Sequence, residues 1–162
     1  MSDAIGYAKQ NDVYYLKISG ALRHDSAAPL DALIERWFEN ETCDFTAVVI
    51  DLNETVFMDS TAIGLLASIA REMLARGLNA PTVFSANSEI NQLLQSLRLD
   101  EVFTLVQKTT SGIECISAQS EASEQCGAAA ILKAHEALVE LNQANRVAFQ
   151  SVIDLFRSEL GG

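Results

Sequence analysis

Residues 48–66, VVIDLNETVFMDSTAIGLL, change from one apolar pattern to another within a single short stretch. Residues 48–52 form a continuous apolar run, which is typical of a strand buried on both faces of a sheet. From Ile63 onward, apolar side chains recur at helical spacing, which predicts a helix. The pair Asp59-Ser60 stands where that helix begins. The stretch therefore predicts a central parallel strand, followed by a helix with Asp59 and Ser60 at its N-terminus.

The surrounding sequence continues the alternation of strands and helices. A turn is predicted at 53–55, and a weak first strand is predicted near 5–8. Further strands are predicted at 13–19, 81–84 and 102–106, and further helices at 29–38 and 88–97. The order β-β-α-β-α-β-α-β predicts an α/β fold with a mostly parallel sheet and helices packed on it.

The composition of the chain changes after Lys108. Residues 109–127 are rich in Ser, Thr, Gln, Glu and Gly and show no apolar periodicity, which predicts a linker. Beyond the linker, apolar residues follow a 3-4 spacing, which predicts one long amphipathic helix over 128–160. We therefore expect a domain over 1–108, a linker over 109–127 and a long C-terminal helix.

The predicted C-terminal helix has an apolar stripe that must be covered, because an isolated helix is marginal in water. The stripe contains Ile131, Leu138, Leu141, Val152 and Leu155. Either the chain's own domain or a second copy of the chain would cover it. Asn145 interrupts the stripe where coiled coils often place an amide that sets the register, which favours a homodimer through this helix.

The charge of the chain limits its partners. Eleven basic residues against 22 acidic ones give a formal charge of −11 over 162 residues. Such a charge repels phosphate backbones and anionic membranes, so neither nucleic acid nor a membrane is expected as a partner. The sequence has no run of about 18 apolar residues and no pattern of a secretory signal, so the expected location is the cytoplasm. Protein partners are the remaining class.

Neither a metal site nor a cofactor site is expected. Cys43, Cys115 and Cys126 are too widely spaced for a C-x-x-C motif and are expected to be reduced thiols. The two histidines, His24 and His135, match no standard zinc pattern. The sequence also lacks a G-x-G-x-x-G motif and a Walker A loop.

The segment 47–106 resembles the STAS family, which is named after sulfate transporters and anti-sigma factor antagonists. The likeness extends over about residues 5–108. It rests on the apolar strand followed by Phe57-Met58-Asp59-Ser60-Thr61-Ala62-Ile63-Gly64, and on a closing helix and strand within 90–103. In that family, the serine directly after the aspartate accepts a phosphate. The resemblance therefore implies a STAS-like mixed, mostly parallel sheet and phosphorylation at Ser60, with Thr61 as the less favoured acceptor.

The resemblance also implies a function. In it, the unphosphorylated chain acts as an anti-sigma factor antagonist (anti-anti-sigma factor) that sequesters a serine kinase-type anti-sigma factor. Phosphorylation at Ser60 releases that partner, and a PPM-type serine phosphatase, either free or fused to a response regulator, resets the switch. The implied partner-binding residues are Asp59, Ser60, Thr61, Ile63 and Gly64. The alternative is a phospho-regulated STAS module that controls a non-sigma target, such as a biofilm or motility regulator.

Two features of the sequence bear on this switch. Phosphate at a helix N-terminus meets unpaired N–H groups and the positive end of the helix dipole, so the chain itself accommodates it. Arg23 stands where many members of the family have an acidic residue. A recognition or phosphotransfer contact made by that acidic residue is therefore not expected in this chain. We do not expect an enzyme, because Asp59-Ser60-Thr61 is not a G-x-S-x-G elbow and neither histidine is expected beside Ser60 as a base.

Overall fold

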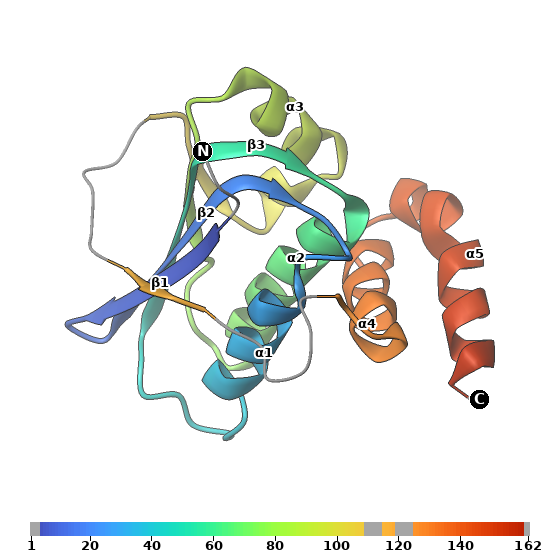
Figure 1. The fold of residues 1–162 in the computed structure, drawn as a ribbon, viewed down its shortest axis with the longest axis horizontal. Coiled ribbons are helices and arrows are strands. Elements are labelled where there is room, and N and C mark those ends of the chain that lie inside the picture. Colours follow the sequence, from blue (N-terminus) through green and yellow to red (C-terminus); the bar gives the residue numbers. More distant parts are fainter. Residues whose placement is uncertain (1–3, 109–114, 119–124, 161–162) are drawn as a thin grey trace.

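The computed structural model describes residues 4–108, 115–118 and 125–160. These residues contain a six-stranded sheet in the order β5-β4-β3-β2-β1-β6. Strands β2 to β5 pair in parallel, whereas β1 is antiparallel to both β2 and β6. The predicted α/β fold with a mostly parallel sheet is confirmed (Figure 1). The strands are β1 (Ala4–Gln10), β2 (Val13–Leu22), β3 (Ala47–Met58), β4 (Thr82–Phe84), β5 (Thr104–Val106) and β6 (Ile116–Ser117).

Strand β3 is longer than the sequence predicts. The turn predicted at 53–55 is wrong, because β3 continues through these residues to Met58. Its pairing with β2 shifts register there, which is how a strand takes up extra residues as a bulge. The buried hydroxyl of Thr55 donates to the Ile18 carbonyl over 2.8 Å and holds the shifted segment against β2. The end of β3 therefore lies beside the end of β2, where the next helix begins.

Helices α1 (Ala28–Trp37) and α2 (Ser60–Ala75) lie together below the sheet in the view of Figure 1, and α3 (Ser88–Ser96) lies above β3. A single 3-10 turn, η1 (Leu99–Glu101), follows α3. Helix α2 is apolar almost all round, which is the pattern of a helix covered on several sides. Its Leu65, Leu66 and Ile69 are fully buried, as are Ile50 and Leu52 of β3. Packing between β3 and α2 is therefore the centre of the core.

The C-terminal segment forms two helices, α4 (Ala128–Val139) and α5 (Gln143–Glu159), so the single helix predicted over 128–160 is interrupted. The break lies at Asn142, whose extended backbone starts α5 and whose side chain accepts the Asn145 N–H over 2.9 Å. Such an N-cap ends one helix and starts another. The expected long C-terminal helix is present as α5, with 17 residues.

Most of the linker predicted over 109–127 lies outside the described residues. Within it, strand β6 pairs with β1 and forms the last strand of the sheet on that side. The predicted domain boundaries at 108 and 127 stay predictions.

The chain's own domain covers α4. Helix α4 packs on α2, and α5 packs on α4, which makes the pair a helical hairpin at the edge of the molecule (Figure 1). Leu138 of the predicted stripe is fully buried, whereas Leu155 is 57% exposed. Asn145 is buried, and its amide donates to the carbonyls of Leu97 (3.0 Å) and Leu138 (3.1 Å). The amide that favoured a homodimer is therefore used within one chain.

Replacing Asn145 with alanine is expected to loosen the hairpin. The change removes the donor of two hydrogen bonds and leaves the buried Leu138 carbonyl with one partner fewer, at a cost of about 1–3 kcal/mol. Urea unfolding followed by circular dichroism measures the loss. Gln143→Ala, an exposed change in the same helix, is the control. It should leave the free energy of unfolding within about 0.5 kcal/mol of that of the native protein. Equal midpoints for the two variants would contradict this role of the amide.

Candidate functional site

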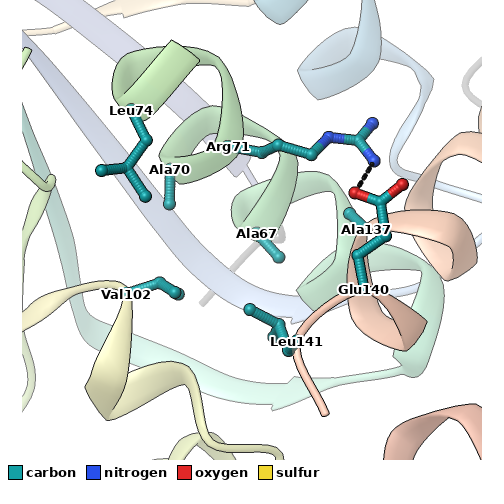
Figure 2. Close-up of a pocket in the computed structure, with 8 residues that line it drawn as sticks. All are labelled: Ala67, Ala70, Arg71, Leu74, Val102, Ala137, Glu140 and Leu141. Atoms are coloured by element: carbon teal, nitrogen blue, oxygen red, sulfur yellow. Dashed lines mark hydrogen bonds and ion pairs between the residues drawn. The ribbon is translucent and has the colours of Figure 1, made fainter. Parts of the chain in front are cut away.

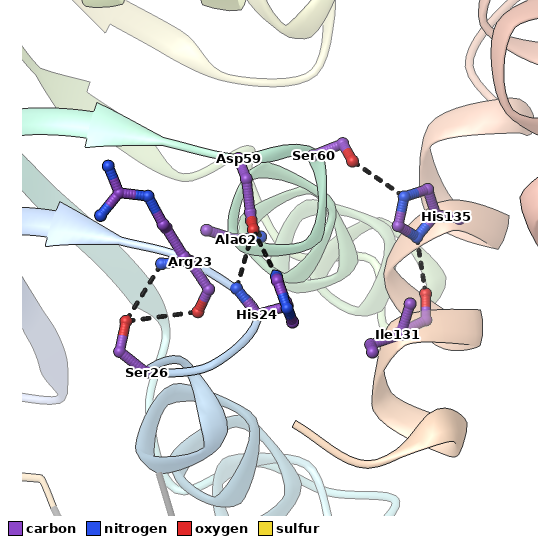
Figure 3. A network of polar contacts seen from close by, with 8 residues as sticks. All are labelled: Arg23, His24, Ser26, Asp59, Ser60, Ala62, Ile131 and His135. Atoms are coloured by element: carbon purple, nitrogen blue, oxygen red, sulfur yellow. Dashed lines mark hydrogen bonds and ion pairs between the residues drawn. The ribbon is translucent and has the colours of Figure 1, made fainter. Parts of the chain in front are cut away.

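The predicted phosphoacceptor lies at the start of α2, directly after β3. Ser60 is the first residue of the helix, and Asp59 is its N-cap (Figure 3). One carboxylate oxygen of Asp59 accepts the Ala62 N–H over 2.9 Å, which satisfies a donor of the first turn. The structure thus confirms that the Asp59-Ser60 pair begins a helix.

The other carboxylate oxygen of Asp59 holds the loop that follows β2. It accepts the His24 backbone N–H over 2.8 Å and lies 3.2 Å from His24 Nδ1. The Asp59 N–H in turn donates to the Leu22 carbonyl over 3.2 Å. Asp59 therefore clamps the ends of β2 and β3 together, and its side chain is only 23% exposed. A partner would therefore contact a carboxylate that is already hydrogen-bonded to its own chain.

Ser60 contacts a histidine from the C-terminal hairpin. Its Oγ lies 2.9 Å from His135 Nε2, and His135 Nδ1 lies 2.8 Å from the Ile131 carbonyl (Figure 3). A carbonyl only accepts, so Nδ1 carries a proton, and in the neutral ring Nε2 accepts the Ser60 hydroxyl proton. The expectation that no histidine lies beside Ser60 is wrong. Seventy-five residues separate the two, and no local pattern in the sequence links them.

The Ser60–His135 pair has the hydrogen bond that joins nucleophile and base in covalent catalysis, but the group that orients the imidazole is a backbone carbonyl and not a carboxylate. The histidine is 3% exposed and packs edge-on against Phe149, with ring centroids 5.4 Å apart. Its position between helices makes it part of a packed interface. The contact therefore joins α4 to the N-terminus of α2.

Three of the predicted partner-binding residues are buried in this structure. Thr61 is 4% exposed and Ile63 is 1% exposed, and Gly64 is buried as well. Of the predicted set, only Asp59 and Ser60 are partly exposed. The sequence pattern places these residues near Ser60 but does not distinguish an outward from a covered position.

Gly64 allows α4 to approach α2 very closely. A Cβ added at Gly64 would lie 2.8 Å from the Cα of Ala134 and closer still to that residue's carbonyl group. Real side chains do not make such contacts with backbone, so only glycine fits at this crossing. Ser60, Gly64, Ala67 and Arg71 are spaced by three or four residues and therefore share one side of α2, which we name the Ser60 stripe.

The far end of the Ser60 stripe is less tightly covered than its beginning. Arg71 forms an ion pair with Glu140 over 2.9 Å, and beside it a pocket of about 150 Å³ lies between α2 and α4 (Figure 2). The other residues that line the pocket are Ala67, Ala70, Leu74, Val102, Ala137 and Leu141. Helix α4 thus closes on α2 at Ser60 and separates from it toward Arg71.

A small exposed patch lies just before the site in the chain. Val56 is 65% exposed and Phe57 is 44% exposed, although both belong to β3. The Arg23 guanidinium stacks over the Phe57 ring at 4.5 Å from its centroid. Arg23, the residue that departs from the resemblance, therefore presents a positive charge on an aromatic ring near Asp59. Exposed aromatic and Arg side chains are frequent in protein interfaces.

Other kinds of site are not evident in the part of the chain that the structure describes. No group of three or more His, Cys, Asp or Glu side chains there is arranged to hold a metal ion. Within the same residues, no helix is both long and apolar enough to span a bilayer. No disulfide joins the three cysteines, all of which the structure describes, and burial raises the pKa of Cys126 to about 11. Cys126 directly precedes Gly127, the N-cap of α4.

Comparison with known proteins identifies the domain. A model of the STAS domain matches residues 4–112. The fold is similar to the anti-sigma factor antagonist SpoIIAA in its unphosphorylated form, with 16% identity and a TM-score of 0.50 over 68% of this chain and 90% of that chain. It is also similar to the protein TM1081, solved by NMR, with 19% identity and a TM-score of 0.53 over 63% of this chain and 79% of that one.

A comparison with curated protein sequences found no match. Helices α4 and α5 lie outside the residues that the STAS model matches. Because that model matches more than half of the chain and the sheet and helices agree with it, this protein belongs to the STAS domain family.

Proposed function

We propose that this chain is an anti-sigma factor antagonist that phosphorylation at Ser60 switches off. The unphosphorylated form binds a serine kinase-type anti-sigma factor in the cytoplasm, phosphorylation at Ser60 weakens that complex, and a PPM-type serine phosphatase restores it. The observation that carries the proposal is the position of Ser60, which is partly exposed at the N-terminus of α2 in a STAS domain. The likeness to SpoIIAA, an anti-sigma factor antagonist of the same fold, supports it.

The geometry supports an electrostatic switch. A phosphate on Ser60 would add about −1.5 to −2 charges next to the Asp59 carboxylate, at the positive end of the α2 dipole. The helix end tolerates that charge, so the domain itself need not refold. A partner fitted to a neutral hydroxyl, and to the exposed patch of Arg23, Val56 and Phe57, would meet a dianion instead. Binding then changes without a change of fold.

Two substitutions at Ser60 test the switch. Ser60→Asp should bind the kinase-type partner about tenfold or more weakly than Ser60→Ala, because the carboxylate reproduces part of the charge of a phosphate. Both variants remove the hydroxyl that contacts His135, so that loss is common to them and the charge distinguishes them. Affinity capture with both forms, mass spectrometry of the captured proteins and calorimetry with the purified partner supply the measurement.

Ser96→Asp, which places a charge at an exposed serine of α3, is the matched control and should bind like the native chain. Equal dissociation constants for Ser60→Ala and Ser60→Asp would contradict the switch. Capture of a biofilm or motility regulator in place of a kinase-type anti-sigma factor would assign the same switch to a non-sigma target.

A further inference from the structure

Helix α4 occupies the side of α2 that begins at Ser60. The contacts run along the whole Ser60 stripe: Ser60 meets His135, Gly64 meets Ala134, and Arg71 meets Glu140. The Ser60 and Gly64 contacts lie at neighbouring residues of α4, and the Arg71 contact lies further along both helices, so α4 follows the stripe over about three turns of α2. We propose that the α4–α5 hairpin is a built-in competitor, which must leave α2 before a partner or a kinase can engage Ser60. This inference rests on the proposed function of Ser60.

The hydrogen bond at Ser60 explains why a kinase must displace α4. Phosphoryl transfer requires the Ser60 Oγ to face the incoming phosphate and to give up its proton. In this structure the Ser60 Oγ lies 2.9 Å from Nε2 of His135, whose ring is buried between α4 and α5. The docked hairpin therefore holds the acceptor hydroxyl toward the chain's own interior. Undocking turns this hydroxyl outward.

The hairpin is attached in a way that allows displacement. Helix α4 contributes Ala130, Ala134, Ala137 and Leu138 to the buried core, and three of these four are alanines, which bury little apolar area each. Two ion pairs support the contact, Arg71–Glu140 at 2.9 Å and Lys133–Asp31 at 2.7 Å. The Arg71–Glu140 pair is exposed, and pairs of this kind contribute little, whereas the Lys133–Asp31 pair is more covered. The sheet and α2 belong to the matched STAS domain, whereas the hairpin lies outside it.

A side chain added to α4 tests the inference without altering any predicted partner-binding residue. Ala134→Leu places three more carbon atoms at the crossing with Gly64 and should lift α4 from α2. Ala129→Leu makes the same change at an exposed position of the same helix and is the matched control. Both variants are made in the full chain.

Docking is measured first, without a partner. Hydrogen exchange should be at least tenfold faster in α4 of Ala134→Leu than in Ala129→Leu, while the amides of β3 stay protected. Alkylation by iodoacetamide should accelerate by a similar factor at Cys126, since this residue is only 5% exposed in the docked chain. Unchanged exchange and alkylation in Ala134→Leu would overturn the inference. If β3 loses protection too, His135→Ala, which removes a contact without adding volume, replaces the variant.

Partner binding is measured second, with the serine kinase that Ser60→Ala captures. Ala134→Leu should bind it about tenfold more tightly than Ala129→Leu and should be phosphorylated faster. An opened hairpin with unchanged affinity and unchanged phosphorylation rate would refute the competition and leave the proposed function intact. An opened hairpin that neither binds nor receives phosphate from any serine kinase would instead refute the proposed function, and the competition with it.

Discussion

Gly64→Ala is expected to release α4 from α2 while the STAS domain stays folded. The added Cβ would overlap the backbone of Ala134, which cannot turn away as a flexible side chain could. Overpacking of this kind costs about 1–3 kcal/mol. Within α2 itself, alanine is the better helix former by about 1 kcal/mol, so the helix gains stability while the docked hairpin loses it. The two effects have opposite signs at two locations, which makes the result easy to distinguish from general unfolding.

Hydrogen exchange read by mass spectrometry separates the two locations. Amides of α4 and α5 should exchange on the order of 10- to 100-fold faster in Gly64→Ala, and those of β3 and β4 should keep their protection. Gly127→Ala is the matched control, because a Cβ at Gly127 has open space around it. Uniform protection in Gly64→Ala would show that α4 accommodates the methyl group. The close crossing would then have no energetic importance.

Ser60→Ala is expected to abolish phosphorylation by the cognate serine kinase entirely. Ser60 is partly exposed and carries the acceptor oxygen, whereas the neighbouring hydroxyl of Thr61 belongs to a residue that is only 4% exposed. Burial therefore agrees with Ser60 as the acceptor and disfavours Thr61. The stoichiometry of incorporated phosphate, measured on the intact protein by mass spectrometry, should be one in the native chain and zero in Ser60→Ala.

Thr61→Val serves as the control for this experiment. It removes the alternative hydroxyl and keeps the branched shape of a buried side chain, so incorporation should stay at one phosphate per chain. Phosphate mapped to Thr61 in the native protein, with Ser60 unmodified, would disprove the assignment. Loss of phosphate in both variants would indicate that the kinase needs both side chains of the first turn of α2 for recognition. Mass spectrometry of peptide fragments from the native protein would then identify the acceptor residue.

The local sequence patterns predicted a strand or helix correctly where its apolar and polar residues followed one regular spacing. The apolar run at 48–52 became the buried strand β3, and the helical spacing after Ile63 became α2. The prediction failed where polar residues lie inside a strand. The turn residues at 53–55 are taken up as a bulge, because pairing with β2 satisfies their backbone groups and the hydroxyl of Thr55.

The C-terminal helices show a different limit. The 3-4 spacing of apolar residues over 128–160 predicted a helix, and these residues are helical in both α4 and α5. Helical periodicity does not reveal the break at Asn142, because an amide that caps a new helix and an amide on the polar face of a continuous helix look the same in a sequence. Nor does periodicity identify what covers the stripe. Asn145 favoured a second copy, yet its amide donates to carbonyls of its own chain.

The sequence by itself determined the α/β fold and the position of Asp59-Ser60 at the start of a helix. Both follow from interactions between residues close in the chain: alternation, helical spacing and an N-cap. Only the tertiary structure decided that His135 meets Ser60 and that Gly64 lies against Ala134. Those contacts join segments about 70 residues apart. They depend on how closely two helix backbones approach, which periodicity does not encode and packing alone establishes.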